Sequence, residues 1–506
     1  MTEQTIKSLE NAEHPQKLKR VVIEPLTRVE GHGKVTLLLD ENDHVQQARL
    51  HIVECRGGAT FIQGRPYWER PVGVQRLCGI CPVSPHLAAA KATDQLVGVS
   101  ELTPSAEKIR RLMHLGQVLQ SHALHFFHLS SPDLLFGFDD PVAHRNIIGV
   151  LEDHPQIARQ GVLLRKFGQE IIRITSGKRI HGTGAIPGGV NKSVSQDEKD
   201  YLLADMQQII DWAVAATTLS RRLFTQGLEY NSKFALIYTN MLSLCGQDGA
   251  MDLYHGGLRA RQADGQLVFD KLDYQHYDEH IREQVKSWSY MKFPFIRQLG
   301  PDAGSYRVGP LARVNNCDFI PTPLAEAERA DFMTYAKGGM VQSTLAYHWA
   351  RMIELLYCAE AIQSLLHDPD IMGSDLLLQN EMQDTGIGVI EAPRGTLFHH
   401  YEINEEGLVT RANLIVSTTN NNQAMNESIR QVALDELDGK SLTEPLLNQI
   451  EVAIRAYDPC LSCATHALGK MPLEVELIDA AGNRVDRLAK NGRGQVGELE
   501  TGNCSC

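Results

Sequence analysis

The sequence lacks any long apolar run, and its aromatic content is low, at 6% Phe, Trp and Tyr. No stretch of about 18 consecutive apolar residues is present, and this excludes a membrane-spanning helix. The first twenty residues contain neither the apolar segment of a secretory signal nor a twin-arginine pair. We therefore predict a cytoplasmic protein.

Basic residues are also in deficit, with 49 Lys and Arg against 62 Asp and Glu, for a formal net charge of −13. A chain of this charge repels nucleic acid and anionic membrane surfaces, so we expect neither as a partner. The 506 residues are 43% hydrophobic and 22% charged. These values are typical of a globular protein with a large core and more than one compact unit.

Hydrophobic patterning predicts an α+β fold that is mainly helical. A central bundle of long helices should lie between small N-terminal and C-terminal antiparallel β regions. Thr103 and Pro104 suit the start of a helix, and a three-to-four spacing of small and apolar residues continues to Ala123. Helices are predicted for residues 104–131, 196–230, 325–366 (with Gly338–Gly339 as a weak point), 424–437 and 443–456. Strands are predicted for residues 34–40, 48–55, 386–418 and 472–479.

Ten cysteines are present, and four of them form two C-x-x-C motifs, Cys78/Cys81 and Cys460/Cys463. In a reducing compartment they should not be disulfides. A single C-x-x-C fits a redox pair, half of a zinc site or buried cysteines without chemistry. The two motifs are far apart, whereas the halves of a structural zinc site usually lie roughly 15–20 residues apart. A metal that joins both ends of the chain is more typical of catalysis. The remaining cysteines are interpreted as a C-terminal tail pair, Cys504 and Cys506, and as small buried hydrophobes, Cys55, Cys245, Cys317 and Cys358.

The motifs read R-x-C-G-x-C and D-P-C-x-x-C-x-x-H, and together they resemble the paired signature of nickel–iron hydrogenase large subunits. The resemblance extends over residues 20–466, and most closely fits the cytoplasmic, bidirectional, nicotinamide-linked group. Further matching segments are residues 28–32 (RVEGH), 187–190 (PGGV), 308–313 (VGPLAR) and 391–395 (EAPRG).

This resemblance implies a buried nickel–iron centre held by four thiolates, which are soft ligands suited to these metals. Cys78 and Cys460 would bind nickel terminally, and Cys81 and Cys463 would bridge nickel and iron. Carbon monoxide and cyanide would complete the iron. A protein of this kind cleaves H2 heterolytically and reversibly. It passes electrons first to an iron–sulfur small subunit, then to flavin and NAD(P) diaphorase subunits. We predict no iron–sulfur cluster and no flavin in this chain.

Three further residues take family roles through the same resemblance. Glu30 matches a proton-relay glutamate beside a nickel-bound cysteine, although its residue type alone favours a salt bridge with Arg28 or a neighbouring residue. Arg394 matches an arginine above the open metal position, where it could donate hydrogen bonds to a cyanide. Thr418 aligns with a hydroxyl that binds the second cyanide, with Ser417 and Thr419 as near alternatives.

His466 closes the second motif. In the family it binds a secondary metal, often magnesium, and precedes a cleavage site, so a maturation endopeptidase would cut between His466 and Ala467 after nickel-insertion proteins have acted. The predicted organisation is therefore a flexible leader (1–19), a hydrogenase domain (20–466) and an extension (467–506) that is removed on maturation. Alternatively, the extension stays and packs as a hairpin.

The sequence departs from the family pattern at two positions. A family histidine after the first motif is replaced by Pro85, and His86 comes one residue later, where it could take over the supporting role. A family glutamate that supports magnesium is replaced by Ala59, with Glu54 close by. Magnesium binding is thus left open.

Three other interpretations compete with a turnover enzyme. A relative from respiratory complex I would have lost the metal cysteines, which are all present here. A hydrogen-sensing protein typically lacks a cleavable extension. A structural zinc protein would not explain Glu30, Arg394 or the other matching segments.

Overall fold

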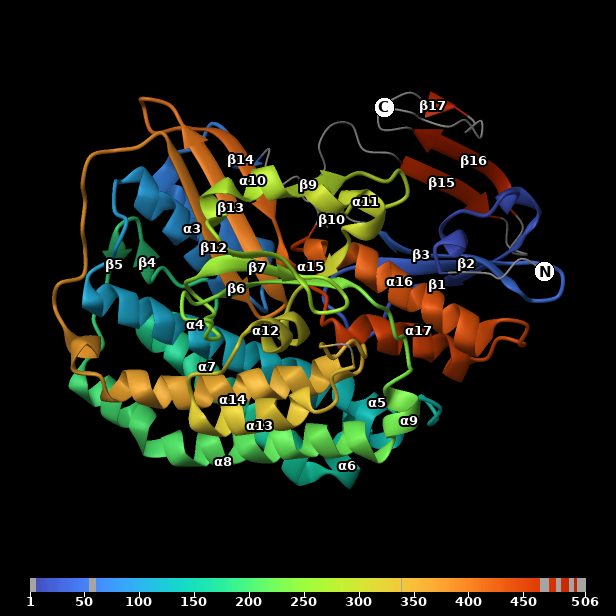
Figure 1. The fold of residues 1–506 in the computed structure, drawn as a ribbon, viewed down its shortest axis with the longest axis horizontal. Helices are drawn as coiled ribbons and strands as arrows, with labels where there is room; N and C mark the ends of the chain where they lie inside the picture. Colours follow the sequence, from blue (N-terminus) through green and yellow to red (C-terminus); the bar gives the residue numbers. More distant parts are fainter. Residues whose placement is uncertain are drawn as a thin grey trace.

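A layer of long helices forms one side of the protein (Figure 1). The computed structural model describes residues 6–53, 61–337 and 339–464 and three strands between residues 473 and 497. The layer is built from α4 (Pro104–Leu124), α7 (Pro155–Ser176), α8 (Gln196–Gln226), α13 (Pro323–Met333) and α14 (Ala346–His367). The predicted central bundle of long helices is confirmed, although α7 was not predicted.

Helix α4 begins as expected, because the Thr103 hydroxyl accepts a hydrogen bond from the amide of Ala106 at 3.2 Å. Beyond Leu124 the chain stays helical through a π-helical turn (His125–Ser130) and α5 (Ser131–Phe136). It ends only at Gly137, whose φ of +94° terminates the helix. Pro132 does not end the helix, because it occupies the first turn of α5, where its missing N–H costs nothing.

The prediction of one helix over residues 325–366 is wrong. The chain forms α13 and α14 with an irregular segment between them, in which Gly339 has a φ of +93°. The side chain of Gln342 donates to the carbonyl of Thr239 at 3.1 Å, and the amide of Val341 donates to Asn315 at 2.8 Å. These bonds to distant segments replace the helical ones. Gly338 lies outside the described residues.

Small antiparallel sheets complete the fold. The predicted N-terminal hairpin is confirmed as β2 (Gly33–Leu39) and β3 (Val45–Ile52), with β1 (Lys19–Ile23) added at the edge of β2. The predicted second β region is confirmed as β12 (Thr385–Ala392), β13 (Gly395–Ile403) and β14 (Val409–Ile415). In the C-terminal extension, β15 (Leu473–Ile478), β16 (Arg484–Lys490) and β17 (Val496–Gly497) pair with one another.

A four-stranded sheet in the middle of the chain was not predicted. Its strands lie in the order β11–β6–β7–β8, which are Tyr306–Arg307, Asn240–Cys245, Gly257–Arg261 and Leu267–Leu272.

The shorter elements are α2 (Arg70–Gly73), α3 (Val83–Leu96), α6 (Ile147–Asp153), α9 (Leu228–Asn231), α10 (Tyr277–His280), α11 (Gly300–Ala303), α12 (Pro310–Asn316), α15 (Ser417–Asn420), β4 (Ala185–Ile186), β5 (Gly189–Val190), β9 (Ile281–Gln284) and β10 (Phe293–Ile296). The two helices predicted before the second cysteine motif are confirmed as α16 (Asn422–Val432), which continues as a π-helical turn to Leu437, and α17 (Glu444–Ala456).

One large hydrophobic core joins the helical layer to the N-terminal sheet, and it includes the four cysteines of the two motifs. In the predicted leader, Leu9 is buried, and Glu10 forms ion pairs with Lys286 and Arg430. None of the described helices is both long and apolar enough to cross a membrane.

Candidate metal centre

The two cysteine motifs meet in the core. Cys78 directly follows a short 3-10 turn, Cys81 lies just before α3, and α17 ends a few residues before Cys460. The sulfur of Cys78 lies 3.1 Å from that of Cys81 and 3.4 Å from that of Cys460, and Cys463 lies 2.9 Å from Cys460. All four sulfurs are within 4.8 Å of one another. Among the described residues, no other group of three or more His, Cys, Asp or Glu is arranged to hold a metal ion.

The donor set fits soft transition metals such as nickel and iron, because it consists of four buried thiols without an oxygen ligand. Hydrogen bonds from the other three cysteines hold the pKa of the Cys78 thiol well below its usual range. Burial raises the pKa of the Cys460 thiol well above its usual range. A first thiolate is thus favoured, whereas further ones need the positive charge of bound metal. Four sulfurs would also suit zinc, so the surrounding groups must distinguish the two kinds of site.

Glu30 lies directly against the second motif. Its Oε2 accepts hydrogen bonds from the sulfur of Cys460 at 3.0 Å and from the amide of Ser462 at 3.1 Å. The hydroxyl of Ser462 donates to Oε1 at 2.6 Å. Arg28 pairs with Asp133 at 2.7 Å instead, so the predicted alternative of an Arg28–Glu30 salt bridge is not what the structure has.

A close backbone approach brings Glu30 to this position. The segment forms a parallel bridge with Cys460, and the amide of Leu461 donates to the carbonyl of Glu30 at 2.9 Å. Gly31 has a φ of +83°, and a Cβ atom there would lie 2.5 Å from the amide nitrogen of Ser462. Only glycine fits this site, which explains its place in the RVEGH segment.

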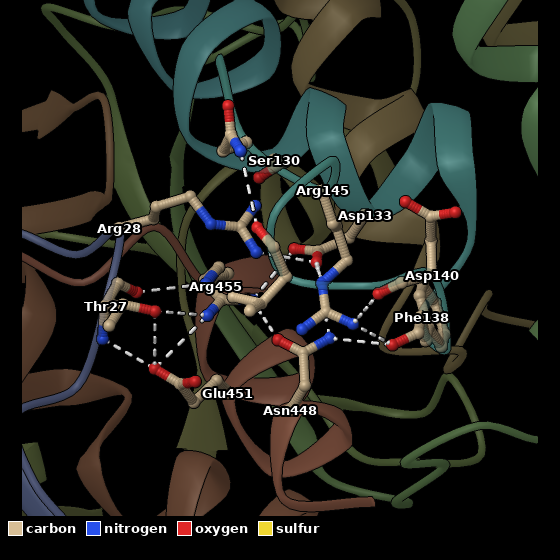
Figure 2. A network of polar contacts seen from close by, with 12 residues as sticks. Thr27, Arg28, Ser130, Asp133, Phe138, Asp140, Arg145, Asn448, Glu451 and Arg455 are labelled. Carbon is tan, nitrogen blue, oxygen red and sulfur yellow. Dashed lines mark hydrogen bonds and ion pairs between the residues drawn. The ribbon is translucent and has the colours of Figure 1, made fainter. Parts of the chain in front are cut away.

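A buried polar network fixes the chain just before Glu30 (Figure 2). Arg455, on α17, donates to the carbonyl of Thr27 at 3.0 Å and to its hydroxyl at 2.9 Å. Its guanidinium also donates to Asp133 at 2.8 Å. Asp133, on α5, holds Arg28 as well. The Glu30 loop is therefore attached to the helix that leads into the second cysteine motif.

Arg394 is buried, and its guanidinium lies beside the sulfurs. Nε donates to the carbonyl of Asp458 at 2.5 Å, and another nitrogen donates to the carboxylate of Asp458 at 2.9 Å. Burial alone would lower the pKa of Arg394, but Asp458 and the cysteines Cys81, Cys460 and Cys78 raise it well above its usual range. The side chain is a permanent cation at the site.

The family segments 308–313 and 391–395 hold Arg394 in place. Arg313 donates to the carbonyls of Ala392 at 2.9 Å and Pro393 at 3.2 Å, immediately before Arg394. It also forms buried ion pairs with Glu354 and Glu391. Removing Arg313 would leave Glu391 and Glu354 buried without a guanidinium partner, with His122 still bonded to Glu354, so Arg313 ties the loop to the helical layer.

Thr418 lies in α15, directly after β14, and its hydroxyl accepts a hydrogen bond from the amide of Cys460 at 3.0 Å. The two alternatives use their protons elsewhere. Ser417 donates to the carbonyl of Gly395 at 2.7 Å, and Thr419 donates to the carbonyl of Ala464 at 3.1 Å. Within the described part of the chain, the hydroxyl proton of Thr418 has no acceptor, so it is available to a ligand at the site.

His86 bonds to the backbone through both ring nitrogens. Nδ1 lies 2.5 Å from the carbonyl of Pro71, and Nε2 accepts from the amide of Ala185 at 3.0 Å. It joins α3 to α2 and β4. His181 instead reaches the carbonyl of Cys78 at 3.0 Å, a contact that no motif in the sequence indicates. The predicted roles of His466, Ala467, Glu54 and Ala59 fall outside the described residues.

Sequence comparisons identify related proteins. Residues 56–136 and 250–466 match the family described as "Nickel-dependent hydrogenase", and residues 20–55 match a family described as "HoxL-like". The chain is 47% identical to the NAD-reducing hydrogenase HoxS subunit beta of Cupriavidus necator, over 93% of this chain and 100% of that protein. It is 40% identical to one of the subunits of the F420-non-reducing hydrogenase from Methanothermobacter thermautotrophicus, over 93% of this chain and 100% of that protein.

Structural comparisons agree. A crystal structure of an NAD+-reducing [NiFe]-hydrogenase in the H2-reduced state has a TM-score of 0.87 at 56% identity, and covers 88% of this chain and 99% of its own. The Ni-Fe-Se hydrogenase from D. vulgaris Hildenborough has a TM-score of 0.72 at 23% identity, covers 89% of this chain and 100% of its own, and shows the same fold. These relatives rule out a structural zinc protein.

Proposed function

The chain belongs to the nickel-dependent hydrogenase family as a catalytic large subunit, and from this premise we propose how its residues take part in the reversible cleavage of H2. The observation that carries the proposal is the convergence of four buried cysteine sulfurs with Glu30 and Arg394 in one site. A bound nickel–iron centre, with carbon monoxide and cyanide on the iron, would supply heterolytic cleavage of H2.

The four thiolates hold the metals. By the family pattern, Cys78, Cys81, Cys460 and Cys463 would together hold the nickel and the iron, with Cys78 and Cys460 on the nickel and Cys81 and Cys463 shared with the iron. The hydrogen bonds that the Cys78 sulfur accepts from the amides of Ile80 and Cys81 support its thiolate form.

Glu30 moves the proton. Its Oε2 is already hydrogen-bonded to the sulfur of Cys460, so a proton on that sulfur can pass directly to the carboxylate. Arg394 supplies fixed positive charge beside the sulfurs, and Thr418 can donate its hydroxyl proton to a ligand of the iron.

Electrons leave through a partner, since the described residues hold no second group of metal-binding side chains. We propose that this partner is an iron–sulfur small subunit, followed by flavin-containing diaphorase subunits that reduce NAD(P). The kinship with a hydrogenase named NAD-reducing supports this acceptor. Because NAD(P) is an intracellular coenzyme, we also propose that the protein works in the cytoplasm.

Maturation completes the site. We propose that an endopeptidase removes residues 467–506 after His466, once nickel-insertion proteins have loaded the metal. The match to the nickel-dependent hydrogenase family ends at residue 466, which supports this boundary. We also propose that His466 binds magnesium, provided that the site tolerates Ala59 in place of the family's supporting glutamate.

Infrared spectra of the purified complex, taken before and after addition of H2, test this function. Sharp carbon monoxide and cyanide stretches that shift with H2 are expected. Mass spectrometry should show a chain that ends at His466. A chain that ends there but carries no such stretches would contradict the proposal, whereas their absence from unprocessed chain would show incomplete maturation.

A further inference from the structure

Ser462 contacts both carboxylate oxygens of Glu30. Its hydroxyl donates to Oε1 at 2.6 Å, and its amide donates to Oε2 at 3.1 Å. The sulfur of Cys460 donates to the same Oε2 at 3.0 Å. One oxygen is therefore shared between the sulfur and a backbone amide, while the serine hydroxyl holds the other.

A glutamate carboxylate is otherwise free to turn, because its last torsion angle has broad, weakly defined minima. Glu30 is also only partly buried, so water can compete for its oxygens. Two donors on different oxygens restrict that rotation. The hydroxyl is the part of Ser462 that a substitution can remove, since the amide remains in any residue.

We propose that Ser462 is a positioning residue that holds Oε2 of Glu30 against the sulfur of Cys460. The inference rests on the proposed function, and it identifies the side chain that prepares the proton relay. In the step concerned, the S–H bond of Cys460 breaks and an O–H bond forms on Glu30, so a thiol and a carboxylate become a thiolate and a carboxylic acid. No electrons are exchanged.

Serine suits both states of the relay. Its hydroxyl donates to the carboxylate, and it can rotate to accept a hydrogen bond from the carboxylic acid, because a hydroxyl carries one proton and two lone pairs. The site is built around it, since a Cβ atom at position 31 would lie 2.8 Å from the Ser462 hydroxyl oxygen. The neighbouring hydroxyls of Ser417 and Thr419 donate to backbone carbonyls instead.

The test uses the mature holoenzyme complex with Ser462→Ala, Ser462→Thr and Glu30→Gln. Ser364→Ala is the matched control, since that hydroxyl donates to the carbonyl of Glu360 on α14, away from the site. Infrared bands give the number of loaded sites. For each loaded site, conversion of para-H2 to ortho-H2 measures cleavage alone, and exchange of D2 with water measures cleavage with proton transfer.

We expect Ser462→Ala to keep para–ortho conversion near the wild-type rate and to lower D2–water exchange about tenfold, which is a part of the roughly 10²–10⁴-fold that a positioned proton-transfer group contributes. Glu30→Gln should lower exchange further. Ser462→Thr, which restores the hydroxyl, and Ser364→Ala should exchange near the wild-type rate.

Equal losses in both assays for Ser462→Ala, or no loss in exchange, would overturn the positioning role. Should Ser462→Ala fail to load metals, Ser462→Thr decides: near wild-type exchange supports the role, and exchange as low as in Glu30→Gln contradicts it. A wild-type enzyme without carbon monoxide and cyanide bands would contradict the proposed function itself, which is a separate outcome.

Discussion

At the scale of single residues, unused hydrogen-bonding capacity indicates which side chains can serve the metals. Thr418 accepts from the amide of Cys460 and has no acceptor for its own proton among the described residues, whereas Ser417 and Thr419 donate theirs to backbone carbonyls. The family resemblance favours Thr418, with Ser417 and Thr419 as near alternatives. The residue types alone could not separate the three hydroxyls, because the difference depends on which carbonyls lie within reach after folding.

Replacing Thr418 with valine tests this difference. Valine has nearly the same shape, but it leaves the buried amide of Cys460 without an acceptor, at a cost of about 1–3 kcal/mol. We expect a shift of one cyanide stretch in the infrared spectrum, and a near wild-type spectrum for Thr418→Ser. Thr410→Val, at an exposed hydroxyl, is the control. An unchanged spectrum for Thr418→Val would show that no ligand of the iron uses this hydroxyl.

Arg394→Lys keeps the positive charge and removes the planar guanidinium that makes two hydrogen bonds to Asp458. A lysine ammonium cannot reproduce the two parallel contacts with the backbone and carboxylate of Asp458, so the charge would no longer be fixed beside the sulfurs. We expect kcat for H2 oxidation to fall about 100-fold, comparable to the loss of one preorganised donor. The control is Arg411→Lys, at an exposed pair with Glu402. Activity within a factor of two of wild type would refute the electrostatic role of Arg394.

At the scale of helices and strands, the sequence predicts best where an end signal and a periodic stripe coincide. The start of α4 at Thr103 was predictable because the capping residue, the proline that follows it and the three-to-four spacing of small and apolar residues agree. The break between α13 and α14 was not, since it depends on bonds from Gln342 and Val341 to segments far away in sequence. Strand β6 is buried at all six positions and so lacks the alternation that identifies a strand.

The polar network in Figure 2 connects the Glu30 loop with α5 and α17, and a substitution at its centre tests this connection. Asp133 is 2% exposed and pairs with both Arg28 and Arg455, while Arg145 lies 3.5 Å away. Asp133→Ala removes the buried carboxylate that Arg28 and Arg455 share, although Arg455 keeps Glu451 and Arg145 keeps Glu444. Breaking a buried pair in this way typically costs about 3–5 kcal/mol. We expect a clearly lower Tm and weaker metal loading, because the Glu30 loop and α17 share this anchor.

A surface pair provides the comparison. Lys19 and Asp43 are bonded at 3.0 Å but lie in solvent, where such a pair contributes about 0–1 kcal/mol. Lys19→Ala, which removes this pair from the exposed strand β1, should therefore leave Tm and metal loading almost unchanged. Equal effects of the two substitutions in calorimetry would show that the Asp133 network does not anchor the loop.

At the scale of the whole molecule, the metal centre joins residues 382 positions apart, Cys78 and Cys460. The residue types and spacing of the motifs were enough to predict that the four cysteines meet in one site, because few chemistries require two distant C-x-x-C pairs with these flanking residues. That Ser462, Asp458 and His181 surround them was not predictable, since serine, aspartate and histidine have many other uses in a chain of this length.

Buried neutral histidines give the whole chain a predictable response to acid. Burial lowers the pKa of His51, His86, His114 and His122 to about 4 and that of His348 to about 3. Below pH 6.5 the unfolded chain binds protons that the folded chain does not. The free energy of unfolding that these neutral histidines contribute is therefore fully present above pH 6.5. It is lost as the pH falls towards 4, by about 1.4 kcal/mol per pH unit for each such histidine.

His348→Leu removes one of these groups and should flatten the acid slope by about one proton. The side chain is 4% exposed, and its Nδ1 has no hydrogen-bond partner in the part of the chain that the structure describes, so leucine removes no polar contact of that nitrogen there. The measurement is the apparent unfolding midpoint of the holoenzyme in guanidinium between pH 7 and pH 4.5. His14→Leu, at an exposed position, should keep the wild-type slope. If His348→Leu keeps it too, the histidine at 348 is protonated in the folded protein, and the acid sensitivity must come from other groups.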